Sequence, residues 1–332
     1  MVNRYKALGL SLLLTLNCFG CAGSVLPQAS AAGTSGGVAA SWIVYWDWEA
    51  GYKEARFARL DGVSVFAASF DKKGGLRVPS QIDFTQLELL RQRNPKQVQY
   101  LSVVNDVHDG KRAALKDAQL LRRLLADKDA QERHAGELVE LCAKHRFNGL
   151  EVDYENFWND KALREAYISF LQLLRQQAQA AGLALRVILE PKALGYAAAL
   201  PDGVDYVVML YNLYGGHSGP GPKADAAFIS KTCKRMEALP GRKSVAFANG
   251  GFHWGPDGKV AGITEEEAER LRCKRGLLAR RDETSQALCY SFEDKGHHEV
   301  WYGDSVTLSF WHQEAAKAGY PVASNWRLGG NL

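Results

Sequence analysis

Three carboxylates alternate with apolar residues in the segment FNGLEVDYENF, residues 147–157. Glu151, Asp153 and Glu155 would share one face of a β-strand, because successive side chains of a strand point to opposite faces. Neighbouring carboxylates raise one another's pKa, and a carboxylic acid that stays protonated near neutral pH can act as a general acid. The same alternation also fits an ordinary strand with one solvated face, so the surrounding elements must decide between the two interpretations.

Strand-like apolar runs alternate with helix-like segments along most of the chain. Eight such runs cover residues 42–46, 62–70, 98–104, 147–154, 183–190, 204–211, 243–250 and 320–326. The longest amphipathic region between them, about 113–145, has helical spacing of its leucines. This alternation predicts fold class α/β, and eight units favour a closed (β/α)8 TIM barrel. A doubly wound open sheet is the alternative, although no GxGxxG or P-loop motif follows the first run.

The interval between the seventh and eighth runs is too long for one helix. We expect a small α+β insertion over residues 251–303, with one helix and two strands at 264–276, 287–293 and 298–303. Thr264 and Glu267 have the spacing of a capping box at the start of that helix. A final helix over about 304–318 would lead into the last barrel strand.

A closed barrel changes the interpretation of the acidic strand. Both faces of a strand in a parallel barrel are covered, one by helices and one by the barrel interior. The three acids would then point inward and could not form a solvated face. Glu155 would lie at the C-terminal end of its strand, where barrel active sites are built, and Asp153 about 6–7 Å deeper. The barrel therefore favours a catalytic role for these two acids.

Three segments carry recognisable motifs in order along the chain: NGLEVDYE at residues 148–155, MLYN at residues 209–212, and residues 298–329. The first two resemble the signatures D-G-x-D-x-D-x-E and M-x-Y-D of family 18 glycoside hydrolases, the chitinase-like barrels. Residues 298–329 are similar to the closing segment of the bacterial spore-cortex and peptidoglycan branch. The resemblance spans about residues 42–329. It implies retaining, substrate-assisted hydrolysis of β-linked N-acetylhexosamine polymers. Peptidoglycan-like glycan is the first expected substrate, and chitin-like glycan is the second.

The resemblance also implies a role for each matching residue. Glu155 matches the general acid, and Asp153 matches the acid that orients the 2-acetamido group of the substrate, whose carbonyl oxygen is the nucleophile. Tyr211 matches the hydroxyl that holds the acetamido oxygen, and Trp326 matches the aromatic floor beneath the sugar. Met209 belongs to the same motif as Tyr211 and is expected to contact the substrate.

Three motif positions depart from the family pattern. Asn148 and Glu151 replace Asp deep in the strand, where packing and hydrogen bonding are their expected roles. Asn212 replaces the Asp of M-x-Y-D, so it can bind substrate but carries no charge that would tune Asp153. A non-catalytic, lectin-like glycan-binding barrel is therefore the alternative function. Because Glu155 is intact, we favour catalysis.

Further cleft candidates follow from their places at strand ends. Trp46 could form a sugar platform or pack against the barrel. Asn105, followed by Asp106, could line the cleft or form a turn. Glu190 could line the cleft or form a salt bridge in a loop. No Cys/His cluster has the spacing of metal ligands, so we expect neither a metal nor another cofactor.

Four cysteines lie beyond the leader region described below. Cys142 is expected to be a buried thiol on a helix. Four cysteines allow three ways of forming two disulfides, and the pair Cys273 and Cys289 is the first choice for a disulfide. The net charge is +4, and about +2 without Arg4 and Lys6 of the leader. This charge is too small for a dedicated nucleic-acid binder, and we expect a monomer that acts on a polysaccharide containing N-acetylglucosamine.

The N-terminus has the pattern of an export signal. An apolar run over residues 7–16 follows two basic residues and is too short to span a bilayer. CFGC, residues 18–21, resembles a bacterial lipoprotein site with Cys21 as the lipidated residue, whereas ASA at 29–31 would allow ordinary cleavage. The protein would be exported, either as a membrane-tethered lipoprotein or as a periplasmic or secreted protein.

These patterns divide the chain into three parts. Residues 1–21 are expected to form the signal peptide, and residues 22–40 a flexible linker rich in Ala, Gly and Ser. Residues 41–332 are expected to form the catalytic barrel with its insertion.

Overall fold

The structure, a computed structural model, describes residues 39–108 and 113–331. The expected signal peptide, Cys21 and nearly all of the expected linker lie outside these ranges. The first strand already begins at Ala40, one residue before the expected start of the barrel. None of the helices in the described ranges combines the length and the hydropathy needed to cross a membrane.

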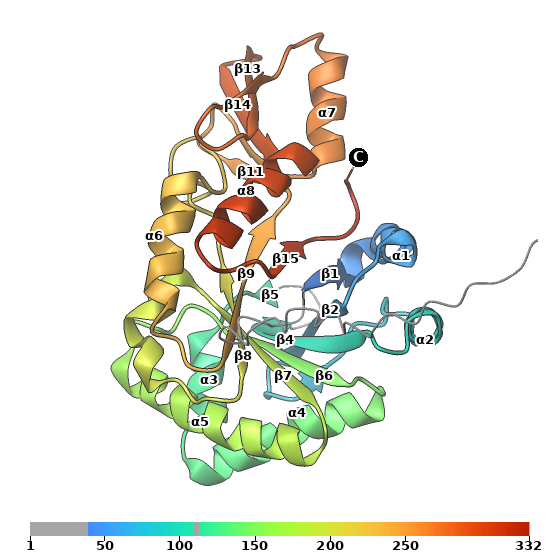
Figure 1. Ribbon diagram of the computed structural model, residues 1–332, viewed down its shortest axis with the longest axis vertical. Coiled ribbons are helices and arrows are strands. Elements are labelled where there is room, and N and C mark those ends of the chain that lie inside the picture. The colour runs from blue at the N-terminus through green and yellow to red at the C-terminus, as the bar shows by residue number, and fades with distance from the viewer. Residues whose placement is uncertain (1–38, 109–112, 332) are drawn as a thin grey trace, which may run out of the picture. The chain divides into compact units, whose positions relative to one another are not determined.

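Eight parallel strands close into a barrel (Figure 1). They are β1 (Ala40–Val44), β2 (Gly62–Asp71), β4 (Val98–His108), β6 (Gly149–Asp153), β7 (Ala184–Leu189), β8 (Asp205–Met209), β9 (Arg242–Ala248) and β15 (Ala323–Trp326). Strand β2 pairs with both β1 and β4, and β15 pairs with both β9 and β1, so the ring has no open edge. The expected TIM barrel is confirmed, and the open doubly wound sheet is wrong.

Helices cover the outside of the barrel, and Figure 1 shows α4 and α5 next to each other beneath β6 and β7. The helices are η1 (Tyr45–Asp47), α1 (Trp48–Phe57), α2 (Phe84–Arg93), α3 (Ala118–Leu124), α4 (Lys128–Lys144), α5 (Lys161–Ala180), η2 (Pro191–Ala199), α6 (Ala226–Met236) and α8 (Ser305–Lys317). Six of them begin at an Asp whose side chain accepts a backbone N–H of the first turn, which satisfies donors that the helix itself cannot pair.

The region 113–145, expected to be helical, is divided. It begins with the short strand β5 (Ala113–Ala114), which pairs with the end of β4, and continues through a turn into α3 and then α4. A second short strand, β3 (Leu76–Arg77), pairs with the end of β2 in the same way. These two additions extend the C-terminal rim of the barrel.

The outer face of β6 is apolar, as the alternation predicted. Leu150, Val152 and Tyr154 are buried in the main core between the strands and the helices. The Tyr154 hydroxyl lies 2.8 Å from Nε2 of His134 on α4, so its one polar atom has a partner. Cys142 of α4 is also fully buried, which confirms the expected thiol. This packing holds the strand so that its other face points into the barrel.

The insertion is a second, antiparallel sheet with one helix packed on it. Its strands are β10 (Gly250–Trp254), β11 (Val260–Ile263), β12 (Arg280–Arg281), β13 (Leu288–Glu293) and β14 (His297–Gly303), in the order β11-β10-β14-β13-β12. The helix α7 (Glu265–Lys274) begins with the expected capping box of Thr264 and Glu267. The α+β character is confirmed, but β10, β11 and β12 were not expected.

The expected Cys273–Cys289 disulfide is wrong, because both cysteines are free thiols. Tyr290 of β13 faces α7, since its hydroxyl donates to the carbonyl of Ala268 on that helix over 2.8 Å. Adjacent strand residues point to opposite faces, so Cys289 points away from the helix that carries Cys273. The alternation along β13 thus separates the two sulfurs.

Candidate active site

A cavity of about 930 Å³ lies at the C-terminal ends of the barrel strands. Eight of the nine residues expected in the cleft line it: Trp46, Asp153, Glu155, Glu190, Met209, Tyr211, Asn212 and Trp326. They come from the ends of β1, β6, β7, β8 and β15 or from the loops that follow. The closed barrel therefore brings together residues that are up to 280 positions apart in the sequence.

Glu151 lies deepest and has a structural environment. Its carboxylate accepts hydrogen bonds from Trp42 Nε1 over 2.7 Å and from the Ser64 hydroxyl over 3.0 Å. Nε of Arg186 lies 3.0 Å from the same carboxylate, and both side chains are fully buried. A buried charge requires such pairing, so this arrangement supports the expected structural role of Glu151.

Asp153 lies two residues further along the same face of β6. Burial raises the pKa of Asp153 well above its usual range, and the charges of Glu155 and Glu151 raise it further. Its Oδ1 is buried and has no hydrogen-bond partner within the described residues. Asp153 therefore offers the cavity wall an oxygen that is free to bind a polar group of a ligand.

Glu155 lies two residues after the end of β6, and its carboxyl group also lines the cavity. Burial raises the pKa of Glu155, whereas the ammonium group of Lys116, with Nζ 2.5 Å from Oε2, opposes that rise. Glu190 and Asp106 add to the rise in the Glu155 pKa through their negative charge. A carboxyl group whose pKa is raised by burial is suited to donate a proton near neutral pH.

Asn105 does not line the cavity as we expected. It is fully buried on β4, where its Oδ1 accepts from the Glu155 N–H over 3.0 Å and its Nδ2 donates to the Glu155 carbonyl over 3.1 Å. These two bonds fix the backbone of Glu155. Asn105 therefore lies behind the cavity wall and positions Glu155. It can reach the Glu155 backbone because β4 pairs with β6.

Glu190 both lines the cavity and forms a salt bridge, the two alternatives expected for it. It lines the cavity, its Oε2 accepts from the backbone N–H of Asn156 over 3.2 Å, and its Oε1 lies 3.1 Å from Nζ of Lys192.

Tyr211 supplies a hydroxyl donor to the same cavity. Burial raises the pKa of Tyr211 well above its usual range, and the negative charges of Asp153 and Glu155 raise it further. The phenol therefore keeps its proton and can donate a hydrogen bond. Met209 and Asn212 flank it, with Met209 almost fully buried and Asn212 exposed.

An aromatic cluster forms the apolar side of the cavity. The Trp326 ring, at the end of β15, lies edge-on to Phe66 with a centroid distance of 4.7 Å. Its centroid lies 5.8 Å from that of Trp42 and 6.4 Å from that of Trp46, which is 52% exposed. The flat rings of Trp46 and Trp326, which line the cavity, suit the apolar face of a sugar.

Several residues of the cavity were missed by the sequence analysis. Phe66, His108, Lys116 and His217 all line it. Lys116 lies in a region whose leucine pattern indicated a helix, but it occupies a turn with φ of +55°. Its N–H donates to Asp106 Oδ1 over 2.8 Å, which holds the turn against β4. Nothing in its sequence context indicates that it contacts Glu155.

No group of three or more His, Cys, Asp or Glu residues in the part of the chain that the structure describes could hold a metal ion. The cavity instead combines a phenol and an aromatic wall with four acidic side chains, those of Asp106, Asp153, Glu155 and Glu190. Such a set can protonate a leaving oxygen, bind an amide group and hold a sugar ring.

Comparison with models of protein families gives no match. Among individual proteins, a Bacillus subtilis protein described as an uncharacterized glycosylase, YvbX, is 23% identical over 267 residues, which are 75% of each chain. The chain spans about half the length of three other Bacillus relatives, including a cortical fragment-lytic enzyme of Bacillus anthracis.

Solved structures share the fold. A chitinase from Chromobacterium violaceum superimposes with a TM-score of 0.75 at 19% identity, covering 89% of this chain and 96% of that one. The spore cortex-lytic enzyme SleL of Bacillus cereus superimposes with a TM-score of 0.73 at 19% identity, and the match covers 90% of this chain and 73% of that one. The chain therefore has the barrel fold of chitinases and spore cortex-lytic enzymes, and the resemblance expected from its three motifs is confirmed.

Proposed function

We propose that the protein is an exported glycoside hydrolase that cleaves β-linked N-acetylhexosamine polymers with retention of configuration. The proposal rests on one arrangement: two acids with raised pKa values, Asp153 and Glu155, stand two residues apart at the wall of a cavity that also holds Tyr211 and Trp326. The names of the similar proteins point to the same substrate class.

Glu155 would donate its proton to the glycosidic oxygen as the bond to the anomeric carbon breaks. The carbonyl oxygen of the substrate's own 2-acetamido group would attack that carbon, so no protein carboxylate forms a bond to the sugar. Water would then release the product, with Glu155, now ionised, as the base. Glu155 would therefore be ionised after the first step and protonated again after the second.

Asp153 and Tyr211 would hold the acetamido group during this attack. The Tyr211 hydroxyl donates to the acetamido oxygen and fixes its direction, while an oxygen of Asp153 accepts from the acetamido N–H. Positive charge develops on the acetamido group as its oxygen bonds to carbon. The lone pairs of the Asp153 oxygen that accepts from this N–H stabilise the charge, and no proton has to leave or reach Asp153 in the step.

Peptidoglycan-like glycan is the first substrate we propose, because the closing segment resembles the spore-cortex branch and cortex-lytic enzymes are among the similar structures. Chitin-like oligomers are the second. We further propose that residues 1–21 direct export and that Cys21 is lipidated. Cleavage after residue 31 would instead leave a periplasmic or secreted protein.

Chromogenic oligomers test this function directly. The wild-type protein should release the chromophore from a β-linked N-acetylglucosamine oligomer but not from the matched glucose oligomer, which lacks the acetamido nucleophile. Efficient turnover of the glucose oligomer would refute substrate assistance. Binding of the N-acetylglucosamine oligomer without turnover would favour the lectin-like alternative.

A further inference from the structure

A second cavity of about 740 Å³ adjoins the active-site cavity. Trp46, Tyr211, Asn212 and Trp326 line both cavities, so a chain of sugars bound in the first can continue into the second. The remaining wall comes from Lys223, from η1 and α1, from the end of β9, from β10, β11 and the start of α7, and from the segment after β15. The residues special to this cavity therefore meet parts of the glycan away from the bond that is cleaved.

Lys223 is the unusual residue of this second cavity. It lies in the loop between β8 and α6, its Nζ donates to the carbonyl of Asn249 over 2.8 Å, and Nζ lies 5.2 Å from the centroid of the Phe252 ring. A lysine ammonium has three N–H donors. Within residues 39–108 and 113–331, no carboxylate forms an ion pair with Lys223, so its charge is offset only by dipoles and a ring.

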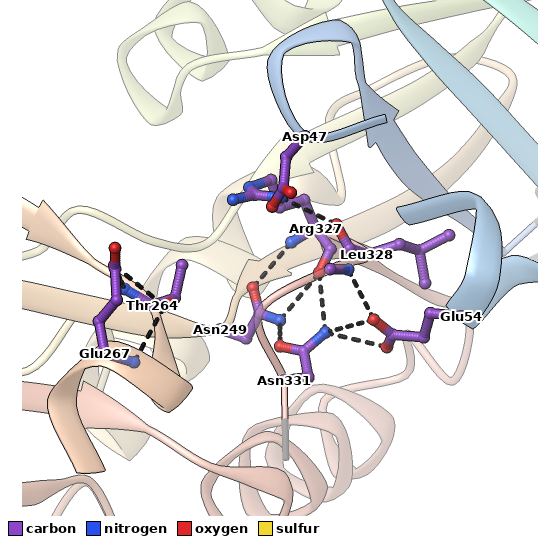
Figure 2. A network of polar contacts seen from close by, with 9 residues as sticks. Asp47, Glu54, Asn249, Thr264, Glu267, Arg327, Leu328 and Asn331 are labelled. Atoms are coloured by element: carbon purple, nitrogen blue, oxygen red, sulfur yellow. Dashed lines mark hydrogen bonds and ion pairs between the residues drawn. The ribbon is translucent and has the colours of Figure 1, made fainter. Parts of the chain in front are cut away.

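Three acids in or near this cavity have other partners, and Figure 2 shows their contacts. Asp47 pairs with Arg327 over 2.7 Å, and Glu267 accepts from Thr264 at the start of α7 over 2.8 Å. Behind the wall, Glu54 accepts from the Asn331 side chain over 2.9 Å. These contacts leave Asp47, Glu54 and Glu267 engaged away from Lys223.

The surroundings of Lys223 disfavour its charge in the free protein. Burial, together with repulsion from Arg327, lowers the pKa of Lys223 to about 8. A partly buried cation without a counter-ion is unfavourable, and a bound anion would relieve that cost.

We propose that Lys223 binds a carboxylate carried by a sugar of the glycan, at least one sugar away from the cleaved bond. This inference rests on the proposed function and narrows its substrate to glycans with carboxylated N-acetylhexosamine residues. One ammonium group balances one negative charge. A doubly charged phosphate ester would place an excess negative charge near Glu266 and Glu267, which line the same cavity.

A pair of matched substrates tests this inference. One is a β-linked N-acetylglucosamine oligomer in which alternate sugars carry a 3-O-lactyl carboxylate, and the other carries the neutral lactyl amide at the same positions. Lys223→Met should raise KM about tenfold to a hundredfold for the acid, the range of a charge-assisted hydrogen bond. It should change KM for the amide by less than about twofold, and Lys223→Arg should retain most of the preference for the acid.

The matched control is Lys231→Met, which removes a charge from an exposed position on α6. It should leave both KM values unchanged. Equal effects of Lys223→Met on the acid and the amide, or no preference of the wild-type protein for the acid, would overturn the inference while leaving the proposed hydrolysis intact.

Binding separates this inference from a failure of the proposed function. Calorimetry on the Glu155→Gln variant, which needs no turnover, should show tighter binding of the acid than of the amide. Adding Lys223→Met to that variant should abolish the difference. If the wild-type protein cleaves neither substrate but this binding difference is present, the proposed hydrolysis is wrong and the carboxylate site stands.

Discussion

Replacing Lys116 with Met should extend hydrolysis toward higher pH. Glu155 must be protonated to donate its proton, so activity falls as the pH rises through its pKa. The Lys116 ammonium, 2.5 Å from the carboxylate, stabilises the ionised form and keeps the pKa of Glu155 lower than burial alone would. Removing that charge raises the pKa of Glu155, and the alkaline limb of kcat/KM moves upward.

The size of the effect follows from the distance between the two charges. At 2.5 Å, two unit charges attract by about 1.7 kcal/mol in a medium as polar as water. Lys116 is 49% exposed, so salt and solvent screening reduce this to roughly 1 kcal/mol. At a pH above the limb, kcat/KM for a neutral oligomer should therefore rise about fivefold, while the acidic plateau stays unchanged.

Two variants serve as controls for Lys116→Met. Lys116→Arg keeps the charge and should leave the pH profile in place. Lys192→Met removes a lysine of similar exposure that pairs with Glu190 over 3.1 Å instead of with Glu155, and its alkaline limb should move much less. The assay is kcat/KM against pH on a chromogenic N-acetylglucosamine oligomer. An alkaline limb of Lys116→Met that stays in place or moves downward would refute the reasoning.

Two predictions concern residues behind the cavity. Asn105→Ala removes both bonds to the backbone of Glu155, so kcat should fall about tenfold or more with little change in KM, and urea unfolding should show a loss of about 1–3 kcal/mol. An unchanged kcat would contradict its positioning role. Glu151→Ala leaves Arg186 buried without its counter-ion and should lower the free energy of unfolding by about 3–5 kcal/mol. The double variant Glu151→Ala, Arg186→Met should recover part of that loss; if it recovers none, the pairing is not the cause.

The sequence predicted the barrel well because its strands are buried on both faces and separated by helices. The acidic strand was also predictable, since burial of Leu150, Val152 and Tyr154 on one side leaves only the interior for the acids on the other. The insertion was only partly predictable. Its strands β10 and β11 have the sequences GGFHW and VAGI, which are rich in Gly and too short for a clear alternation.

The contacts around the acids depend on strand pairing and turns that the sequence does not reveal. Asn105 binds the backbone of Glu155 because β4 pairs with β6 in one register, with Val104 opposite Asp153. Lys116 reaches Glu155 because its turn interrupts a region with helical spacing. Cys273 and Cys289 are close enough in sequence to suggest a bridge, but the alternation along β13 directs them apart.

The central claim is that Glu155 is the proton donor, and hydrolysis by Glu155→Gln tests it most directly. The amide has the same size but no acidic proton, so kcat on a chromogenic N-acetylglucosamine oligomer should fall about a hundredfold to ten thousandfold with little change in KM. Glu165→Gln, which removes an exposed carboxylate from α5, should retain wild-type activity. Equal rates for Glu155→Gln and the wild-type protein would contradict the account.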